Sequence, residues 1–487
     1  MIIASKPFSV FDGQAEMPRC HITRESTELL AELQQQQVRF VHWKGNTHLP
    51  ASLEGKTDIE ILVHPNSRQQ FEAILKKRFY KKLNARPWNS YPGIEDWLGL
   101  DADTGNLLHL HTHYDLATGI KYGKYLQLPW LEQFFGHLKT DELTGWPIPI
   151  PEMETIVLLI RIHANRLHNK PGIPAPKQNE LRELLSQVQV QRLHELCREL
   201  QLKVPANLHI EINRIMQDNS VPAMMHLSSL FYNQLSRCVK TTGPMTALTT
   251  FYYKFFLKTN RYAGRFTGPA QLKKTIPQGG KIIALVGSDG AGKSTLCNDL
   301  VKWLTFKIDA HYFYLGKRPF IKSYNQQLFS ITNFLFNNGV ISRYFRNLAG
   351  NFYYILLIRK KTKMLRLAKR LSEKNSVVIC DRFPQKDIMG YYDGPKLPFK
   401  KNGWFPRLEM KLFKKLCKTE PDVVFRLNIT PEMASRRKPV YDYRMIEQKC
   451  NNLSKLSFGS AKIIDVDAGR PYEQVLIDLK KKIWENL

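Results

Sequence analysis

Long apolar runs are missing from this chain of 487 residues. A helix that crosses a bilayer needs about 20 consecutive apolar residues, and a stretch such as Phe352–Ile358 is far too short. The N-terminus also lacks the basic segment and apolar core of a secretory signal. We therefore expect a cytoplasmic protein, either free in solution or peripheral to a membrane.

Paired cysteines are missing as well. The chain has seven cysteines, an odd number, and no Cys-x-x-Cys pair. Disulfide frameworks and structural zinc sites both need cysteines in recurring pairs. The distribution therefore indicates reduced thiols. It argues against a disulfide framework and against a structural zinc site.

Acidic residues are scarce in the second half of the chain. Residues 251–487 hold 45 lysines and arginines against 18 aspartates and glutamates, which gives this half +27 of the total formal charge of +29. A basic charge concentrated in one half favours a polyanionic partner. We expect a nucleotide and a negatively charged acceptor, with nucleic acid or an anionic membrane surface as alternatives.

The length exceeds that of one ordinary core, so several domains are expected. Residues 1–135 alternate helical stretches with short strands, which are expected at 38–43, 58–63 and 107–113. Residues 136–243 have a helical pattern. Residues 244–280 form an aromatic and basic connector, and residues 281–487 return to alternating strands and helices. The predicted fold class is α/β, with an α+β domain first and a parallel sheet last.

The most informative motif opens the last segment. An apolar run at 281–286, typical of a buried parallel strand, leads into the pattern Gly-x-x-x-x-Gly-Lys-Ser and then into a helical pattern. This is a phosphate-binding loop, in which backbone N–H groups and a helix N-terminus surround a triphosphate. The predicted nucleotide-binding residues are Gly287, Ser288, Asp289, Gly290, Ala291, Gly292, Lys293, Ser294 and Thr295.

Two side chains of this loop have predicted roles in the chemistry. Lys293 supplies a mobile positive charge for the phosphates, and the hydroxyl of Ser294 is a predicted ligand of Mg²⁺. The loop therefore predicts a nucleoside triphosphate with Mg²⁺ as its ligand.

Four further strands are predicted at α/β spacing, at 311–315, 377–380, 423–429 and 462–466. With the first strand they make a five-stranded parallel sheet with helices on both faces, whose ligand site lies at the carboxyl ends of the strands. Asp381 and Arg382 directly follow one of these strands. We predict Asp381 as a carboxylate that holds Mg²⁺ and Arg382 as a clamp on phosphate.

Arg436 and Arg437 follow the strand at 423–429 after a short turn. Cations at this place are predicted to form a lid that neutralises charge on the transferred phosphoryl group. A solvated basic helix end is the alternative interpretation.

Together these motifs resemble the thymidylate kinase family of P-loop kinases over about residues 281–487. The resemblance rests on the loop at 287–295, Asp381-Arg382-Phe383, Pro421-Asp422 ahead of a strand, and the arginine pair. It implies ATP and Mg²⁺ as cofactors, with the aspartate–arginine pair between donor and acceptor. It also implies that residues 465–469 lie near adenine.

Three places depart from that family. After Asp381-Arg382-Phe383 the chain has Pro384-Gln385-Lys386-Asp387 and then Asp393-Gly394-Pro395, where the family has Ser and Tyr-Gln partners. Gly316-Lys317-Arg318-Pro319 stands where the family has an acidic-Pro-Gly turn, and Arg359–Lys363 lies in the helix where it has Ala-Asp-Arg. The extra cations indicate an acceptor that already carries negative charge. The acceptor therefore stays open between a nucleoside monophosphate and another phosphorylated molecule, including a glycan or a lipid-linked sugar.

A second resemblance lies in the first segment. Trp43-Lys44-Gly45-Asn46, followed by Asp58-Ile59-Glu60-Ile61, resembles the nucleotidyltransferase superfamily over about residues 35–120. Alternate residues of a strand point to the same face. Asp58 and Glu60 are therefore predicted metal ligands that would bind a triphosphate through Mg²⁺.

The resemblance implies a third acid on a later strand. The predicted strand at 107–113 instead places His109, His111 and His113 on one face. Either these histidines substitute in the metal site, or the module has lost catalysis and kept a binding role.

A binding role for the basic half is the alternative to catalysis. The aromatic run Phe251–Phe256, with Lys254 and Lys258, resembles an interfacial anchor. Residues 344–374 predict a basic, partly amphipathic helix. Both features fit an anionic membrane surface or nucleic acid.

Overall fold

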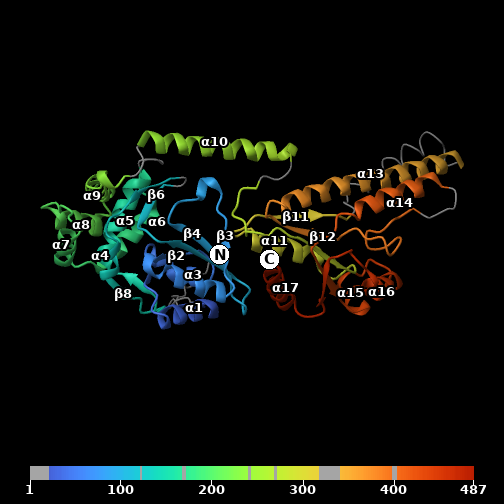
Figure 1. Ribbon diagram of the computed structural model, residues 1–487, viewed down its shortest axis with the longest axis horizontal. Helices are drawn as coiled ribbons and strands as arrows, with labels where there is room; N and C mark the ends of the chain where they lie inside the picture. Colours follow the sequence, from blue (N-terminus) through green and yellow to red (C-terminus); the bar gives the residue numbers. More distant parts are fainter. Residues whose placement is uncertain are drawn as a thin grey trace, which may run out of the picture.

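The chain builds two separate five-stranded sheets, one from each half (Figure 1). The computed structural model describes residues 21–120, 123–166, 172–239, 243–267, 271–316, 340–397 and 403–487. Lys317 and Arg318, which were expected to meet a charged acceptor, lie outside these ranges.

Five short strands form a mixed sheet in the first half, in the order β1-β2-β5-β4-β3. They are β1 (Phe40–His42), β2 (Asp58–Val63), β3 (Lys81–Leu83), β4 (Ile94–Leu100) and β5 (Leu107–His113). β2 and β5 are parallel, whereas β4 is antiparallel to both β5 and β3. The strands expected at 58–63 and 107–113 are confirmed, and the one expected at 38–43 is shorter. β3 and β4 were missed because charged residues and a glycine interrupt their apolar pattern.

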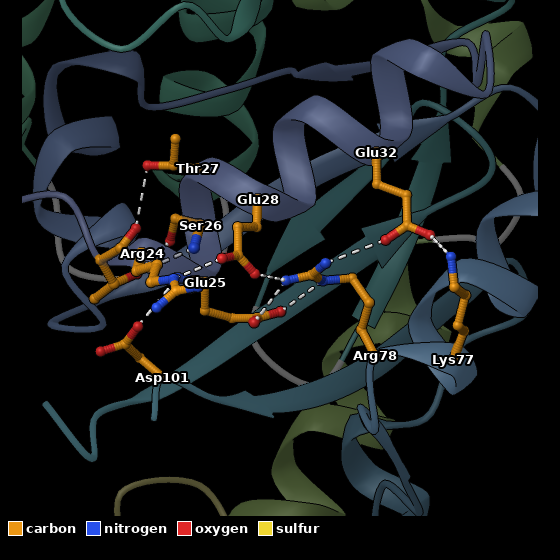
Figure 2. A network of polar contacts seen from close by, with 10 residues as sticks. Arg24, Glu25, Ser26, Thr27, Glu28, Glu32, Lys77, Arg78 and Asp101 are labelled. Carbon is orange, nitrogen blue, oxygen red and sulfur yellow. Dashed lines mark hydrogen bonds and ion pairs between the residues drawn. The ribbon is translucent and has the colours of Figure 1, made fainter. Parts of the chain in front are cut away.

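Three helices accompany this sheet: α1 (Arg24–Gln35), α2 (Leu49–Leu53) and α3 (Arg68–Lys77). The side chain of Thr23 caps α1 by accepting a hydrogen bond from the backbone N–H of Ser26. Arg78, directly after α3, reaches three glutamates of α1 (Figure 2). Its guanidinium lies 2.8 Å from Glu25, 2.9 Å from Glu28 and 3.1 Å from Glu32. One cation thus fixes α1 against the sheet.

A helical part follows after two hairpins and a short helix. The hairpins and helix are β6 (Ala117–Ile120), β7 (Gly123–Gln127), α4 (Leu131–Gly136), β8 (Leu138–Thr140) and β9 (Pro147–Pro149). The helices are α5 (Pro151–Arg166), α6 (Ala175–Gln187), α7 (Val190–Glu199), α8 (Leu208–Asp218) and α9 (Val221–Asn233). α5 is buried along most of its length, and the core around it also includes Val41, Trp43 and Leu62 from the mixed sheet.

The connector expected at 244–280 contains one long helix, α10 (Gly243–Thr267). It lies along one edge of the molecule with few neighbours in view (Figure 1). Its inner contacts include Trp88, whose ring lies 5.7 Å from that of Phe256 and 6.4 Å from that of Tyr253.

The second half is an α/β unit with a five-stranded, all-parallel sheet in the order β11-β12-β10-β13-β14. The strands are β10 (Ile282–Gly287), β11 (Ala310–Tyr314), β12 (Val377–Asp381), β13 (Val423–Asn428) and β14 (Lys462–Asp467). The described helices are α11 (Lys293–Leu304), α13 (Val340–Ser372), α14 (Trp404–Leu416), α15 (Pro431–Arg437), α16 (Tyr443–Asn452) and α17 (Tyr472–Asn486). Separate apolar cores cover the two faces. The predicted parallel sheet is confirmed.

The two halves touch through backbone and core. Asn84 and Thr275 exchange a pair of backbone hydrogen bonds of 2.7 and 3.1 Å. Leu83, Leu98 and Leu107 of the mixed sheet belong to the same apolar core as α11 and α17. This contact positions the second half against the side chains of β2, β4 and β5.

Candidate functional site

The phosphate-binding loop connects β10 to α11. Gly290 and Gly292 have φ values of +91° and +80°, which L side chains rarely adopt. A Cβ on Gly290 would lie 2.6 Å from the carbonyl oxygen of Ala434 in α15, so glycine also allows a close approach of the two backbones. The loop thus curls at the N-terminus of α11, where backbone N–H groups face an anion.

Lys293 is buried within this loop. Its ammonium donates a hydrogen bond of 2.6 Å to the carbonyl oxygen of Ser288. Burial and, after it, the nearby charge of Arg382 lower the pKa of Lys293 to about 8. A phosphate in the loop would stabilise the charged form.

Ser294 and Asp381 meet at the carboxyl ends of β10 and β12. The Ser294 hydroxyl donates to Oδ2 of Asp381 at 2.5 Å, and the hydroxyl of Tyr312 donates to the same oxygen at 3.1 Å. Oδ1 of Asp381 is buried and has no hydrogen-bond partner among the described residues. An orphaned carboxylate oxygen beside a hydroxyl fits Mg²⁺, which prefers oxygen ligands.

Arg382 has a positive φ of 70°, an unusual backbone conformation for a residue with a side chain. Its guanidinium lies 3.3 Å from Asp289 of the loop and 3.8 Å from Asp393. Lys449 of α16 also pairs with Asp289. Burial works to raise the pKa of Asp289, but the hydrogen bond and charge of Lys449 hold that pKa below its usual range.

A cavity of about 320 Å³ opens next to this group. Arg382, Lys396 and Lys449 contribute positive charge to its wall, and Asp289 and Asp393 contribute negative charge. Its aromatic lining residues are Tyr314, Tyr391, Tyr392 and Tyr441. A cavity with aromatic walls and cations beside the phosphate loop suits a phosphorylated molecule with a flat group.

The cations of the basic cluster expected at Arg359–Lys363 lie on α13, where one is buried and three are exposed. Lys361 is buried and pairs with Asp393 at 2.8 Å, whereas Arg359, Lys360 and Lys363 are exposed. Only Lys361 of these four cations therefore supports the wall of the cavity. Asp393, Tyr312 and Lys449 were not predicted as site residues, because contacts between distant segments leave no local pattern.

Arg436 and Arg437 lie exposed in the last turn of α15. The guanidinium of Arg437 donates to the carbonyl oxygen of Ala468 at 3.1 Å, which brings α15 to residues 465–469. α15 also touches the loop at Gly290. The arginine pair is therefore attached to the rim of the loop rather than directed into it.

A second polar cluster lies on one face of the mixed sheet. Asp58 and Glu60 of β2 lie opposite His109 and His111 of β5. Asp96, opposite His111 on β4, adds a third carboxylate. His109 lies 2.8 Å from Asp58 and 3.0 Å from Asp96. The resemblance implied a third acid on a later strand, and the strand at 107–113 has histidines instead. Asp96 lies on the neighbouring strand β4, which the sequence pattern did not reveal.

Three lysines neutralise this cluster, and two of them come from the second half of the chain. Lys307 pairs with Asp58, and Lys274 lies 2.5 Å from Asp96. Lys44 lies 3.0 Å from Glu60. Burial works to raise the pKa of each carboxyl, but these lysines and histidines hold all three pKa values below the usual range.

The donor atoms of Glu60, His111 and His113 lie within 4.8 Å of one another. Such a set suits a transition metal, whereas the three carboxylates suit Mg²⁺. Burial and the charge of Lys44 lower the pKa of His113 well below its usual value, which keeps the ring neutral. The ammonium of Lys44 lies 3.4 Å from His113, so a bound cation would compete with it.

With both sites described, similarity to known proteins can be compared. No family model matches the chain. The uncharacterized ATP-binding protein YghR of Escherichia coli K12 is 30% identical over 219 residues, which cover 42% of this chain and 86% of that protein. The chain belongs to the YghR family.

A second relative supports the same grouping. The uncharacterized ATP-binding protein YghS of the same strain is 29% identical over 218 residues, which cover 40% of this chain and 89% of that protein. Both matches cover less than half of this chain, so they leave the rest of it unassigned. Among the described residues, no helix is long and apolar enough to cross a membrane.

Proposed function

We propose that the second half of the chain is an ATP-dependent kinase. It would transfer the γ-phosphoryl group to a nucleoside monophosphate, as a thymidylate kinase does, or to another phosphorylated acceptor. The names of YghR and YghS describe ATP-binding proteins and support nucleotide binding. The observation that carries the proposal is the 2.5 Å contact of Ser294 with Asp381, beside Arg382 and its cavity.

In this proposal the loop and the residues around it have separate tasks. The backbone of residues 287–292 and the Lys293 ammonium hold the triphosphate. Ser294 and Asp381 would hold Mg²⁺, which would reduce the negative charge of the triphosphate. Arg436 and Arg437 would need to turn inward from the rim to reach the transferred group.

Arg382 stands between donor and acceptor. A phosphate oxygen of the acceptor attacks the γ-phosphorus, the bond to the β–γ bridging oxygen breaks, and ADP leaves. The acceptor oxygen is already ionised near neutral pH, so the reaction needs positioning and charge neutralisation more than a general base. The tyrosines of the cavity would hold a base or sugar ring of the acceptor.

The test is transfer of labelled γ-phosphate from ATP to nucleoside monophosphates, including dTMP, and to sugar phosphates. Lys293→Ala should lower turnover at least about a hundredfold. Lys302→Ala, on an exposed lysine of the same helix, is the matched control and should keep turnover. A Lys293→Ala protein as active as the control would refute the proposal.

A second candidate function belongs to the first half. The three carboxylates Asp58, Glu60 and Asp96 on one face support a nucleotidyltransferase-like module that binds a triphosphate through Mg²⁺. Labelled nucleoside triphosphates and candidate acceptors test it. Asp58→Ala with Glu60→Ala should abolish transfer, while Asp103→Ala with Glu142→Ala, at exposed acids, should not. Equal transfer by both double variants would remove this candidate.

The division into domains is part of the same proposal. We assign residues 1–135 to the nucleotidyltransferase-like domain, 136–243 to a helical domain, 244–280 to the connector and 281–487 to the kinase. The helical core that reaches into the mixed sheet supports treating the first two as one functional unit.

A further inference from the structure

The outer face of α10 is unusual for a surface helix. It exposes large apolar side chains by 55–69%: Met245, Leu248, Phe251, Tyr252, Phe255 and Tyr262. These are a third of the 18 exposed large apolar side chains among the described residues. Scattered apolar residues are normal on a surface, whereas a contiguous patch marks an interaction site.

Helical geometry gathers these side chains into one stripe. At 3.6 residues per turn, the six positions cover an arc of about 120°. The opposite arc includes Thr250, which is buried, and Tyr253, which packs on Trp88, while Phe256 at the edge of the stripe also packs on Trp88. α10 therefore has one face packed against the protein and another whose large apolar side chains are exposed.

The charges of α10 define the partner. Residues 243–267 contain Lys254, Lys258, Arg261 and Arg265 and no acidic residue. The exposed Lys254 and Lys258 lie on the flank of the apolar stripe. Phe251 and Phe255 stack on each other with their ring centroids 6.5 Å apart.

A helix with an aromatic face and flanking lysines is suited to the boundary between acyl chains and anionic headgroups. We propose that α10 docks this chain onto the surface of a membrane that contains anionic lipids. The aromatic stripe enters the interface, and the lysines contact the headgroups. Nucleic acid fits the stripe less well, because its phosphates would leave the apolar side chains in water.

The experiment uses the full chain with vesicles. Phosphatidylcholine vesicles with an equal part of phosphatidylserine should bind the protein at low salt. High salt, or phosphatidylcholine alone, should weaken binding. Phe251→Glu with Phe255→Glu should weaken it about a hundredfold, since two apolar anchors are replaced by charges.

The matched control is Phe79→Glu with Leu143→Glu, which makes the same charge change at two exposed apolar residues outside α10. It should bind vesicles within about twofold of the unchanged protein. Circular dichroism and the ATP affinity of both double variants confirm that each is folded. Equal vesicle binding by the two variants would overturn the proposal.

Two further outcomes would also overturn it. One is absence of binding to the anionic vesicles at low salt. The other is evidence for a different occupant of the stripe. The unchanged protein would then not bind vesicles but would self-associate or bind a single-stranded oligonucleotide, and the Phe251→Glu/Phe255→Glu protein would lose that association.

Discussion

At the scale of single residues, the loop lysine has the most informative environment. Lys293 is buried, and its pKa of about 8 lies well below the 10.5 of an exposed lysine. The ammonium form of Lys293 is therefore less stable in the free protein than the ammonium form of an exposed lysine is. A bound triphosphate reverses this, because it favours the ammonium form.

Nucleotide affinity should fall as pH rises above about 8, with a limiting slope of about tenfold per pH unit, because binding then takes up a proton on Lys293. The same group makes folding stability rise with pH between about 8 and 10.5, where the unfolded chain binds the extra proton. Calorimetric titration across this range measures the first effect. Lys293→Arg, whose guanidinium does not titrate, should flatten the slope; an unchanged slope would contradict the assignment.

At the scale of elements, three glutamates of α1 share one cation from outside the helix. Glu25, Glu28 and Glu32 follow one another at helical spacing and all meet Arg78 (Figure 2). Arg78 is 15% exposed, so this group is only partly screened by water. The glutamates would repel one another without it.

Arg78→Met should lower the free energy of unfolding by about 2–4 kcal/mol, because it leaves three carboxylates without their shared partner. Arg24→Met is the control: Arg24 pairs with Glu28 on the same helix, but it is 71% exposed. That change should cost less than about 0.5 kcal/mol. Urea unfolding of both variants measures the difference, and similar losses would show that Arg78 has no special role.

At the scale of the whole molecule, the two halves are joined by charge as well as by core. Lys274 and Lys307 of the basic second half pair with carboxylates of the first half. These contacts lie at the face of the mixed sheet where β2 and β4 present Asp58 and Asp96. The carboxylate cluster of the first half is therefore completed by lysines of the second half.

Lys274→Met with Lys307→Met should destabilise the whole chain by about 2–4 kcal/mol, because the buried Asp96 and the partly buried Asp58 each lose a cation. Lys254→Met with Lys258→Met removes the same charge from exposed sites of α10 and should change stability by less than about 0.5 kcal/mol. Differential scanning calorimetry compares the two. If the control is destabilised as much as the test variant, general charge rather than the contact between halves is responsible.

The sequence by itself determined the parallel sheet and its loop. The signals that predict them are local in the sequence: the apolar run of β10, the glycines after it and the helical pattern from Lys293. Each signal depends on neighbouring residues alone. The position of Asp381 at the end of a buried strand was equally local. For this reason all five predicted strands of this sheet agree with the structure to within about one residue at each end.

Only the tertiary structure decided which residues meet from distant segments. Asp96 lies in the same cluster as Asp58 because β4 pairs with β5, and no pattern within Ile94–Leu100 predicts that pairing. Lys307 reaches Asp58 across 249 positions of the chain. Ion pairs of this kind depend on how sheets and cores pack, and packing places together side chains whose separation along the sequence carries no signal.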